Sequence, residues 1–249
     1  MKILILAAGK GTRLLPLTRN TPKSLLELGH GLTLLETQLE AIRECGLREV
    51  VVVTGYRTEQ IEAKIHHYGA FDFQVVYNPF YDQANNLVSA WLACPYAGDD
   101  FVLVNGDDIF RAEVLQRLAE KPGEVNMVVS RKEAYDEDDM KVWTQDGRVW
   151  KVSKKLPPEE TNGESIGMMR FRGQGARWFR EELERMVRRP ENLEVFYLQA
   201  LQNMMDDGLP VGYVDCAPEE WCEVDFHPDL KMVKDHLLSK LVLPEFLRA

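Results

Sequence analysis

The stretch KILILAAGKGTR, from Lys2 to Arg13, runs from apolar residues directly into a loop with two glycines and two cations. The apolar run Ile3–Ala8 predicts a buried strand, because it has the length of a strand and ends at a glycine. In the loop Gly9–Arg13, the glycines would let backbone N–H groups approach an anion, and the lysine and arginine would add positive charge. A tight turn with solvated cations explains these residues equally well.

The loop matches neither of the two common phosphate-binding motifs. The dinucleotide motif Gly-x-Gly-x-x-Gly fails because Leu14 stands at the position of the third glycine. The pattern Gly-x-x-x-x-Gly-Lys-Ser/Thr of P-loop proteins is also absent from the sequence. If the loop binds phosphate, it therefore does so through a different pattern.

The charge balance argues against nucleic acid and anionic membranes as partners. The chain has 249 residues, of which 45% are hydrophobic and 28% charged, and its formal net charge is -10. This is the composition of a globular protein with a sizeable core. Proteins that bind nucleic acid carry an excess of basic residues instead. A few local cations can still hold a small anionic substrate.

The cysteines and the absence of long apolar runs predict a cytoplasmic protein. No two of the four cysteines are spaced as Cys-x-x-Cys, and the five histidines supply no zinc-binding pattern. The apolar start is shorter than the core of a signal peptide, and no run approaches the roughly 18 apolar residues of a membrane span. We therefore expect free thiols in a reducing compartment. A homodimer is left open.

Alternating short apolar runs and amphipathic stretches predict the fold class. The expected strands are Ile3–Ala8, Glu49–Thr54, Phe73–Tyr77, Phe101–Asn105 and Val125–Ser130. The expected helices between them are Leu34–Cys45, Thr58–His67, Asn86–Ala93 and Arg111–Ala119. This order predicts an α/β fold with a Rossmann-like, mostly parallel mixed sheet sandwiched by helices. Ligands of such sheets bind beyond the carboxyl ends of the strands, so Gly9–Arg13 and Gly106–Asp108 are expected to meet there.

The second half has a different pattern. Met140–Thr144 and Arg148–Val152 predict a hairpin around an Asp-Gly turn. The other expected elements are strands at Ser165–Phe171, Val211–Val214 and Trp221–Val224, and helices at Gln174–Arg188, Phe196–Asp206 and Pro228–Lys240. The polar stretch Leu156–Glu164 is expected to be a loop, because too little chain follows it to build an independent domain. We therefore predict one domain over residues 1–249.

The residues after the glycine loop extend it into a long motif. The stretch LAAGKGTRLLPLTRNTPK, from Leu6 to Lys23, resembles the signature of the nucleotidyltransferases that join a nucleoside triphosphate to a sugar-1-phosphate or another small phosphate. The resemblance implies a fold like that of the nucleotide-diphospho-sugar transferases, with residues 1–130 binding nucleotide and 131–249 binding the acceptor. It implies that Arg13 contacts the leaving phosphates and that Lys23 reaches the reacting phosphates. The residues expected to bind nucleotide are Leu6, Ala7, Ala8, Gly9, Lys10, Gly11, Thr12, Arg13, Asn85 and Gly106.

The same resemblance implies a magnesium site. Relatives place one metal-binding aspartate at the end of a buried strand, where Asp107 is a better match than Asp108. A second aspartate comes late in a Glu-x-Asp segment, which here ends at Asp225. Carboxylates are suitable ligands for the Mg²⁺ that accompanies a triphosphate. Taken alone, Asp107 is equally typical of a turn, and Asp225 is more typical of a helix cap.

A second motif suggests the branch of the family. The segment YDQANNLVS, from Tyr81 to Ser89, resembles the phosphocholine cytidylyltransferases and relatives that activate aminoethylphosphonate. This branch uses CTP, and the resemblance implies that Asn85 contacts the base or sugar, although a helix N-cap is an alternative role. The sequence departs from the phosphocholine enzymes at Ala84, where they often carry an aromatic residue.

The acceptor would be bound by residues of the second half. The resemblance implies that Lys154 contacts the α-phosphate or the acceptor, with Lys155 as a substitute. Lys141, Glu164 and Trp221 are expected to bind the acceptor. A choline-like cation would need an aromatic cage or carboxylates, and the candidates are Tyr135, Trp143, Tyr197, Trp221, Asp136, Glu219 and Glu220. Core packing explains each aromatic residue equally well.

Together these features predict a Mg²⁺-dependent cytidylyltransferase. It would join CTP to a small phosphate or phosphonate acceptor and release pyrophosphate by in-line attack on the α-phosphate. The alternatives are a sugar-1-phosphate nucleotidyltransferase and a regulatory protein that binds nucleotide without turnover. Gly163–Gly167 also matches the Gly-x-Ser-x-Gly motif of serine hydrolases, but it lacks the strand before it and the helix after it that this motif requires.

Overall fold

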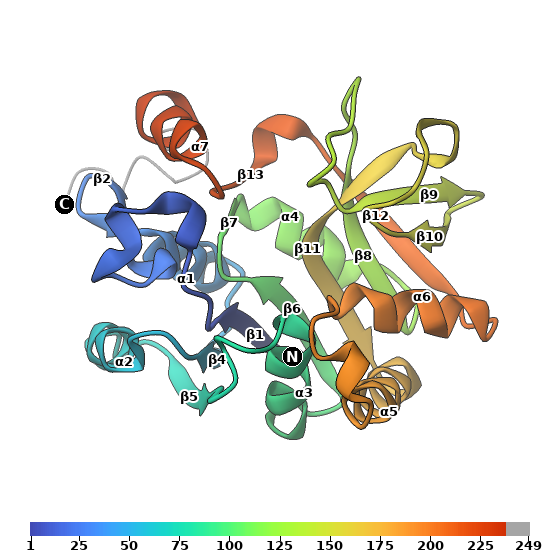
Figure 1. Cartoon of the computed structure of the whole chain (residues 1–249), viewed down its shortest axis with the longest axis horizontal. Helices are drawn as coiled ribbons and strands as arrows, with labels where there is room; N and C mark the ends of the chain where they lie inside the picture. Colours follow the sequence, from blue (N-terminus) through green and yellow to red (C-terminus); the bar gives the residue numbers. More distant parts are fainter. Residues whose placement is uncertain (238–249) are drawn as a thin grey trace.

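The computed structural model describes residues 1–237, and its centre is a nine-stranded mixed sheet (Figure 1). The strands on one side of the sheet are parallel, and β11 runs antiparallel to both of its long neighbours, β6 and β8. The predicted fold class is therefore confirmed. The order across the sheet is β5 (Asp72–Tyr77), β4 (Glu49–Thr54), β1 (Lys2–Ala7), β6 (Asp100–Asn105), β11 (Gly163–Arg172), β8 (Val125–Ser130), β12 (Val211–Cys216), β10 (Arg148–Val152) and β9 (Lys141–Gln145).

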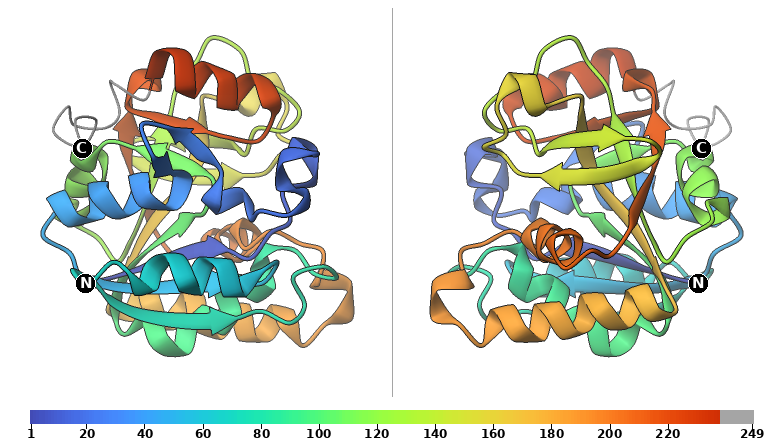
Figure 2. Two further views of the ribbon diagram at one scale, coloured as in Figure 1. Left: turned by 90° about the vertical axis from the view of Figure 1, so that its left-hand side faces the viewer. Right: turned by 90° about the vertical axis from the view of Figure 1, so that its right-hand side faces the viewer.

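Helices cover both faces of the sheet, as Figure 2 shows. One face carries α1 (Leu34–Glu44), α2 (Thr58–His66) and α4 (Ala112–Glu120). The other carries α3 (Asn86–Ala97), α5 (Gln174–Val187) and α6 (Leu198–Asp206). The buried residues of β1 alternate between these layers, since Leu4 packs on one face and Ile3 and Ile5 on the other. A run that is apolar on both faces is what a central parallel strand requires.

Strand β11 ties the two halves of the chain together. It belongs to the second half but lies between β6 and β8 of the first half, and its Arg170 is buried. The Arg170 guanidinium donates to both carboxylate oxygens of Asp100 at the start of β6, each at 3.0 Å. Phe171 stacks on Phe179 of α5, with ring centroids 4.0 Å apart. The sheet is thus continuous across the boundary near residue 130, although the prediction of one domain over 1–249 stays a prediction.

The structure also contains short elements that the sequence did not predict. They are β2 (Glu27–Gly29), β3 (Leu32–Thr33), β7 (Asp108–Phe110) and the 3-10 turns Thr12–Leu14, Leu17–Arg19, Lys23–Leu25, Pro158–Glu160, Pro190–Asn192 and Pro218–Glu220. Strands of two or three residues are too short to show an alternating pattern. The predicted strand at Trp221–Val224 is β13 (Trp221–Glu223), and it pairs antiparallel with β7.

Several predicted boundaries shift by a few residues. β11 begins at Gly163, so the loop predicted over Leu156–Glu164 ends two residues earlier. The last helix starts as α7 (His227–Met232) and continues as a π-helical turn to residue 237. The remainder of the helix predicted up to Lys240 lies outside the described residues. Within residues 1–237, no helix combines the length and hydrophobicity needed to cross a bilayer.

Candidate functional site

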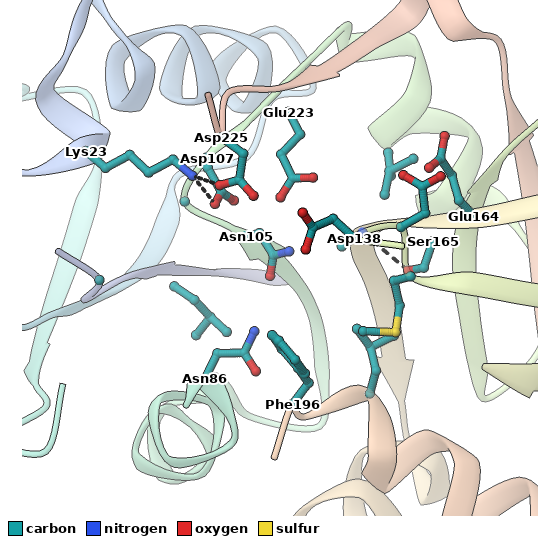
Figure 3. A pocket seen from close by; sticks show the side chains of 18 of the residues that line it. Lys23, Asn86, Asn105, Asp107, Asp138, Glu164, Ser165, Phe196, Glu223 and Asp225 are labelled. Atoms are coloured by element: carbon teal, nitrogen blue, oxygen red, sulfur yellow. Dashed lines mark hydrogen bonds and ion pairs between the residues drawn. The ribbon is translucent and has the colours of Figure 1, made fainter. Parts of the chain in front are cut away.

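A cavity of about 800 Å³ opens at the carboxyl ends of β1 and β6 and extends into the second half of the chain (Figure 3). Residues 6–9 at the end of β1 and residues 105–107 at the end of β6 line its first part. Lys154 and Glu164 line the part toward the second half. The cavity therefore lies where ligands bind in open α/β sheets.

The glycine loop contributes its first residues and Arg13 to the cavity. Leu6, Ala7, Ala8 and Gly9 line it together with Arg13, whereas Lys10, Gly11 and Thr12 do not. Lys10 forms an ion pair with Asp82 outside the cavity.

Two glycines hold the loop in place. Gly11 adopts a φ of 62°, and a Cβ there would lie 2.9 Å from the Cβ of Lys23. Gly106 donates its N–H to the Leu6 carbonyl at 3.0 Å, and a Cβ there would lie 2.6 Å from that oxygen. Both positions therefore depend on glycine, because any side chain would push the loop away from its neighbours.

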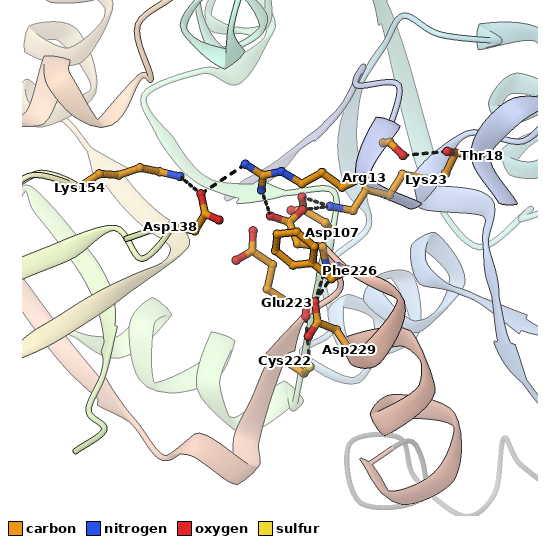
Figure 4. Close-up of polar contacts among 12 residues, drawn as sticks. Arg13, Thr18, Lys23, Asp107, Asp138, Lys154, Cys222, Glu223, Phe226 and Asp229 are labelled. Atoms are coloured by element: carbon orange, nitrogen blue, oxygen red, sulfur yellow. Dashed lines mark hydrogen bonds and ion pairs between the residues drawn. The ribbon is translucent and has the colours of Figure 1, made fainter. Parts of the chain in front are cut away.

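Lys23 joins two distant carboxylates at one end of the cavity (Figure 4). Its Nζ lies 2.7 Å from Oδ2 of Asp107 and also contacts Asp225. Arg13 Nη1 lies 2.8 Å from Oδ2 of Asp225. The antiparallel pair β7–β13 brings these segments together, and the N–H of Val224 donates to the Asp107 carbonyl at 3.1 Å. The four residues predicted to act on the phosphates and the metal thus converge in the structure.

Glu223 completes a cluster of three carboxylates that the sequence predictions did not include as a whole. Asp107, Glu223 and Asp225 each offer one oxygen, and these oxygens lie within 4.8 Å of one another. An all-oxygen donor set of this size suits a hard cation such as Mg²⁺. Asp108, by contrast, is buried and does not line the cavity. The preference for Asp107 over Asp108 therefore agrees with the geometry.

The charges in this cluster shift one another's pKa. Burial, followed by the charges of Asp107 and Asp225, raises the pKa of Glu223 to about 8. Burial works against ionisation of Asp225, but Lys23 and Arg13 together hold its pKa below the ordinary value. Burial likewise disfavours the charged form of Lys23, yet the two aspartates raise its pKa. In the protein without metal, Lys23 thus supplies the positive charge that balances the carboxylates.

Asn85 and Asn86 begin α3 at the wall of the cavity. The side-chain oxygen of Asn85 accepts the N–H of Asn86 at 2.7 Å, so Asn85 is the helix N-cap and also lines the cavity. The side-chain oxygen of Asn86 accepts the N–H of Tyr197 at 3.0 Å. The two roles considered for Asn85 are therefore compatible.

Lys154 and Glu164 lie in the part of the cavity formed by the second half. Lys154 Nζ lies 5.0 Å from the Phe196 ring centroid. Glu164 is only 6% exposed, and Lys132 Nζ lies 2.9 Å from its carboxylate and 2.8 Å from that of Asp139. Burial, which outweighs the attraction of Lys132, raises the pKa of Glu164 to about 7. This region therefore mixes cations and carboxylates.

Residues 3–185 match the model of the MobA-like NTP transferase domain. The chain belongs to this family. Choline-phosphate cytidylyltransferase of Streptococcus pneumoniae is 35% identical over 111 residues, which are 45% of this chain and 47% of that protein. The chain thus aligns with about half the length of this relative. CTP:phosphoglutamine cytidylyltransferase of Campylobacter jejuni is 26% identical over an alignment of 259 positions that covers 93% of this chain and 98% of that one.

Solved structures agree with the fold of this MobA-like NTP transferase. CTP:phosphocholine cytidylyltransferase from Streptococcus pneumoniae superposes with a TM-score of 0.76 and 22% identity, over 94% of this chain and 97% of that one. Family and fold together bear out the resemblance to nucleotidyltransferases that the sequence motifs suggested.

Only some of the residues predicted to bind the acceptor of this transferase line the cavity. Trp221 and Glu164 line the cavity, whereas Lys141 does not. Lys141 is buried, and its ammonium donates to the carbonyl of Lys154 at 2.8 Å, so it lies behind that residue. Lys155 also does not line the cavity. The geometry therefore favours Lys154 among the three lysines.

The aromatic candidates fare differently. Tyr197 is completely buried, and its hydroxyl lies 3.2 Å from the side-chain oxygen of Asn105. Tyr135, Trp143, Glu219 and Glu220 do not line the cavity, while Asp136 does. Tyr81, Phe196 and Phe226 line it but were not predicted, because nothing in their sequence surroundings distinguishes them from core aromatics.

The Gly163–Gly167 motif lies inside β11, not at a strand-to-helix turn.

Proposed function

We propose that the chain is a Mg²⁺-dependent cytidylyltransferase that joins CTP to a small phosphate or phosphonate acceptor. An acceptor oxygen would form a bond to the α-phosphorus while the bond to the β-phosphate oxygen breaks, and pyrophosphate would leave. Nucleotide would bind mainly to residues of the 1–130 half and the acceptor mainly to residues of the 131–249 half. The cytoplasmic location and the open question of a homodimer stay predictions from the sequence.

One observation carries this proposal. A single cavity is lined by Gly9 and Arg13 of the glycine loop and by Lys23, the three-carboxylate cluster and Lys154, although they come from distant parts of the chain. Transfer between two anions requires positive charge from several directions and fixed relative positions of the reactants. A cavity lined by Arg13 and Lys23 on one side and Lys154 on the other meets this requirement.

Each residue would have a distinct part in the reaction. The guanidinium of Arg13 can donate two hydrogen bonds to a pair of phosphate oxygens, whereas Lys23 and Lys154 act as point charges. Asp107, Glu223 and Asp225 would hold Mg²⁺. When bound, this ion would supply positive charge that neutralises the phosphates. Asn85, at the start of α3, would contact the nucleoside.

The choice of CTP rests on the family branch. The Asn-Asn segment at the start of α3 resembles cytidylyltransferases, and two of the relatives found carry CTP or cytidylyltransferase in their names. The acceptors in those names differ, namely choline phosphate and phosphoglutamine. They share a small organic group that bears one phosphate. We therefore assign the acceptor only to the class of small phosphates and phosphonates.

Pyrophosphate release tests the proposal directly. The protein is mixed with Mg²⁺, with CTP, UTP, ATP or GTP, and with phosphocholine, 2-aminoethylphosphonate, phosphoglutamine or glucose-1-phosphate. We expect release with CTP and one of the first three acceptors. A preference for UTP and glucose-1-phosphate would instead support the sugar nucleotide alternative. Binding of nucleotide without release across the panel would support a regulatory protein.

A further inference from the structure

One carboxylate, that of Asp138, contacts cations on both sides of the cavity. Asp138 Oδ1 lies 3.3 Å from Nη2 of Arg13 and 3.6 Å from Nζ of Lys154 (Figure 4). Arg13 follows β1 in the first half of the chain, and Lys154 follows β10 in the second. Asp138 therefore links the two sides of the cavity.

Asp138 differs from the other carboxylates near Arg13. Asp225 shares an oxygen cluster with Asp107 and Glu223, and Asp138 is not part of that cluster. The Asp138 side chain is 54% exposed, so burial does not fix it. Within the described residues, its side-chain ion pairs are with these two cations. Both are residues that the proposed function assigns to phosphate groups.

Contacts other than the ion pairs of Asp138 also hold its loop in place. The loop covers residues 131–140, between β8 and β9. Its Lys132 holds the adjacent Asp139 at 2.8 Å, and the N–H of Asp136 donates to the Asp139 carboxylate at 2.6 Å. These contacts fix the position of Asp139. They therefore also keep the adjacent Asp138 close to Arg13 and Lys154, independently of its own ion pairs.

We propose that Asp138 occupies the place of a substrate phosphate and must be displaced when a polyphosphate binds. Carboxylate and phosphate oxygens are alternative acceptors for the same guanidinium and ammonium donors. A phosphate entering between Arg13 and Lys154 would also be repelled by the carboxylate. Asp138 thus lowers the affinity of the cavity for phosphate and sets how strongly it retains pyrophosphate. This inference rests on the proposed function for the roles of Arg13 and Lys154.

The test compares the binding of inorganic pyrophosphate to the wild type and to Asp138→Asn by isothermal titration calorimetry at constant Mg²⁺. Exposed ion pairs contribute little, so we expect the dissociation constant of the variant to fall only about two- to fivefold. The gain should shrink as salt is raised, because salt screens exposed charges. Because Asp138 is exposed, we expect Asp138→Asn to fold as the wild type does. Thermal melting of both proteins checks this.

The matched control is Asp136→Asn. Asp136 lies in the same loop and lines the same cavity, but in residues 1–237 its carboxylate makes no ion pair with Arg13 or Lys154. We expect a smaller gain than with Asp138→Asn. Equal gains in both variants, or unchanged or weaker pyrophosphate binding in Asp138→Asn, would overturn the inference. The result is independent of turnover, so it remains distinguishable from a failure of the proposed function, which shows as no pyrophosphate release by the wild type.

Discussion

Lys23 Nζ lies 2.7 Å from the carboxylate of Asp107, a residue 84 positions further along the chain. The same ammonium contacts Asp225, so one cation balances two of the three clustered carboxylates. Its side chain is only 12% exposed. Lys23 therefore lies where a metal ion and a phosphate would both have to be accommodated.

Lys23→Ala should uncouple metal binding from turnover. Without the ammonium, the carboxylates lose their balancing charge, so Mg²⁺ should bind more tightly in the absence of nucleotide. Turnover should fall by a factor of roughly 100 or more, because a charge on the reacting phosphates is lost. Mg²⁺ titration calorimetry and pyrophosphate release measure the two effects. Weaker Mg²⁺ binding or near-normal turnover would contradict the assignment, and Lys155→Ala, outside the cavity, serves as the control.

Asp107→Asn and Asp108→Asn should have opposite consequences. Asp107 belongs to the carboxylate cluster, so its amide variant should lose Mg²⁺ affinity and nearly all turnover. Asp108 is buried, and its side-chain oxygens have no hydrogen-bond partner in the described structure. Burial, followed by the charges of Asp107 and Glu223, raises the pKa of Asp108 well above its ordinary value, so this side chain is held neutral. A neutral amide of the same shape should therefore leave stability and turnover nearly unchanged.

Measurements on both variants decide the assignment. Pyrophosphate release and urea unfolding are followed for each. Loss of turnover in Asp108→Asn with normal turnover in Asp107→Asn would reverse the roles of the two residues.

Glu164 should make the protein less stable as the pH rises from about 4.5 to 7. Its pKa is raised from 4.5 to about 7, first by burial. Between these values the folded protein retains a proton that the unfolded chain has lost, so the unfolding free energy decreases with pH. The contribution is complete below pH 4.5 and gone above pH 7. A shift of this size corresponds to roughly 3 kcal/mol.

Glu164→Gln isolates this effect. The free energy of unfolding in urea, measured at half-unit pH steps, should fall less steeply between pH 4.5 and 7 in this variant than in the wild type. The pKa of Asp139 is lowered although burial opposes this, so its contribution is lost only below pH 3.8, outside this range. The exposed Glu137→Gln is the control. Identical pH profiles for the wild type and Glu164→Gln would refute the prediction.

Gly167→Ala should displace Asn105 from the cavity wall. Gly167 adopts a φ of 75°, and a Cβ there would lie 2.1 Å from the side-chain nitrogen of Asn105. The side chain must therefore move and lose its contact with Tyr197. We expect a destabilisation of about 1–3 kcal/mol and a higher KM for CTP. Gly147→Ala, with a φ of 76° and open space around it, controls for backbone strain alone. Equal effects on KM in both variants would exclude a role for Asn105.

The elements that were predicted correctly are those with a local signal. In β1, buried residues on both faces mark a central strand, and in α1 the side chains of Thr33 and Glu36 form a capping box. The position of β11 between β6 and β8 has no such signal, because strand order depends on contacts between distant residues.

The site shows the same division. Arg13 and Lys23 lie in one continuous motif and could be proposed from the sequence. Glu223 stands in the Glu-x-Asp segment, but its closeness to Asp107 appears only in the folded chain. Asp138 has no sequence signal, because its contacts with Arg13 and Lys154 arise where separate segments meet. Lys141 was expected to bind the acceptor, but its ammonium donates to the backbone carbonyl of Lys154 instead. This contact depends on the pairing of β9 with β10, which the sequence does not fix.

The unbroken sheet beneath the cavity has a consequence for how such a transferase could change its acceptor. Because β11 is hydrogen-bonded to β6 and β8 of the first half and to β9 of the second, one continuous sheet lies beneath both parts of the cavity. New acceptor preferences would then come from exchanging the segments above the sheet, such as residues 131–140. Grafting that segment from a relative is accordingly the most economical route to redesign.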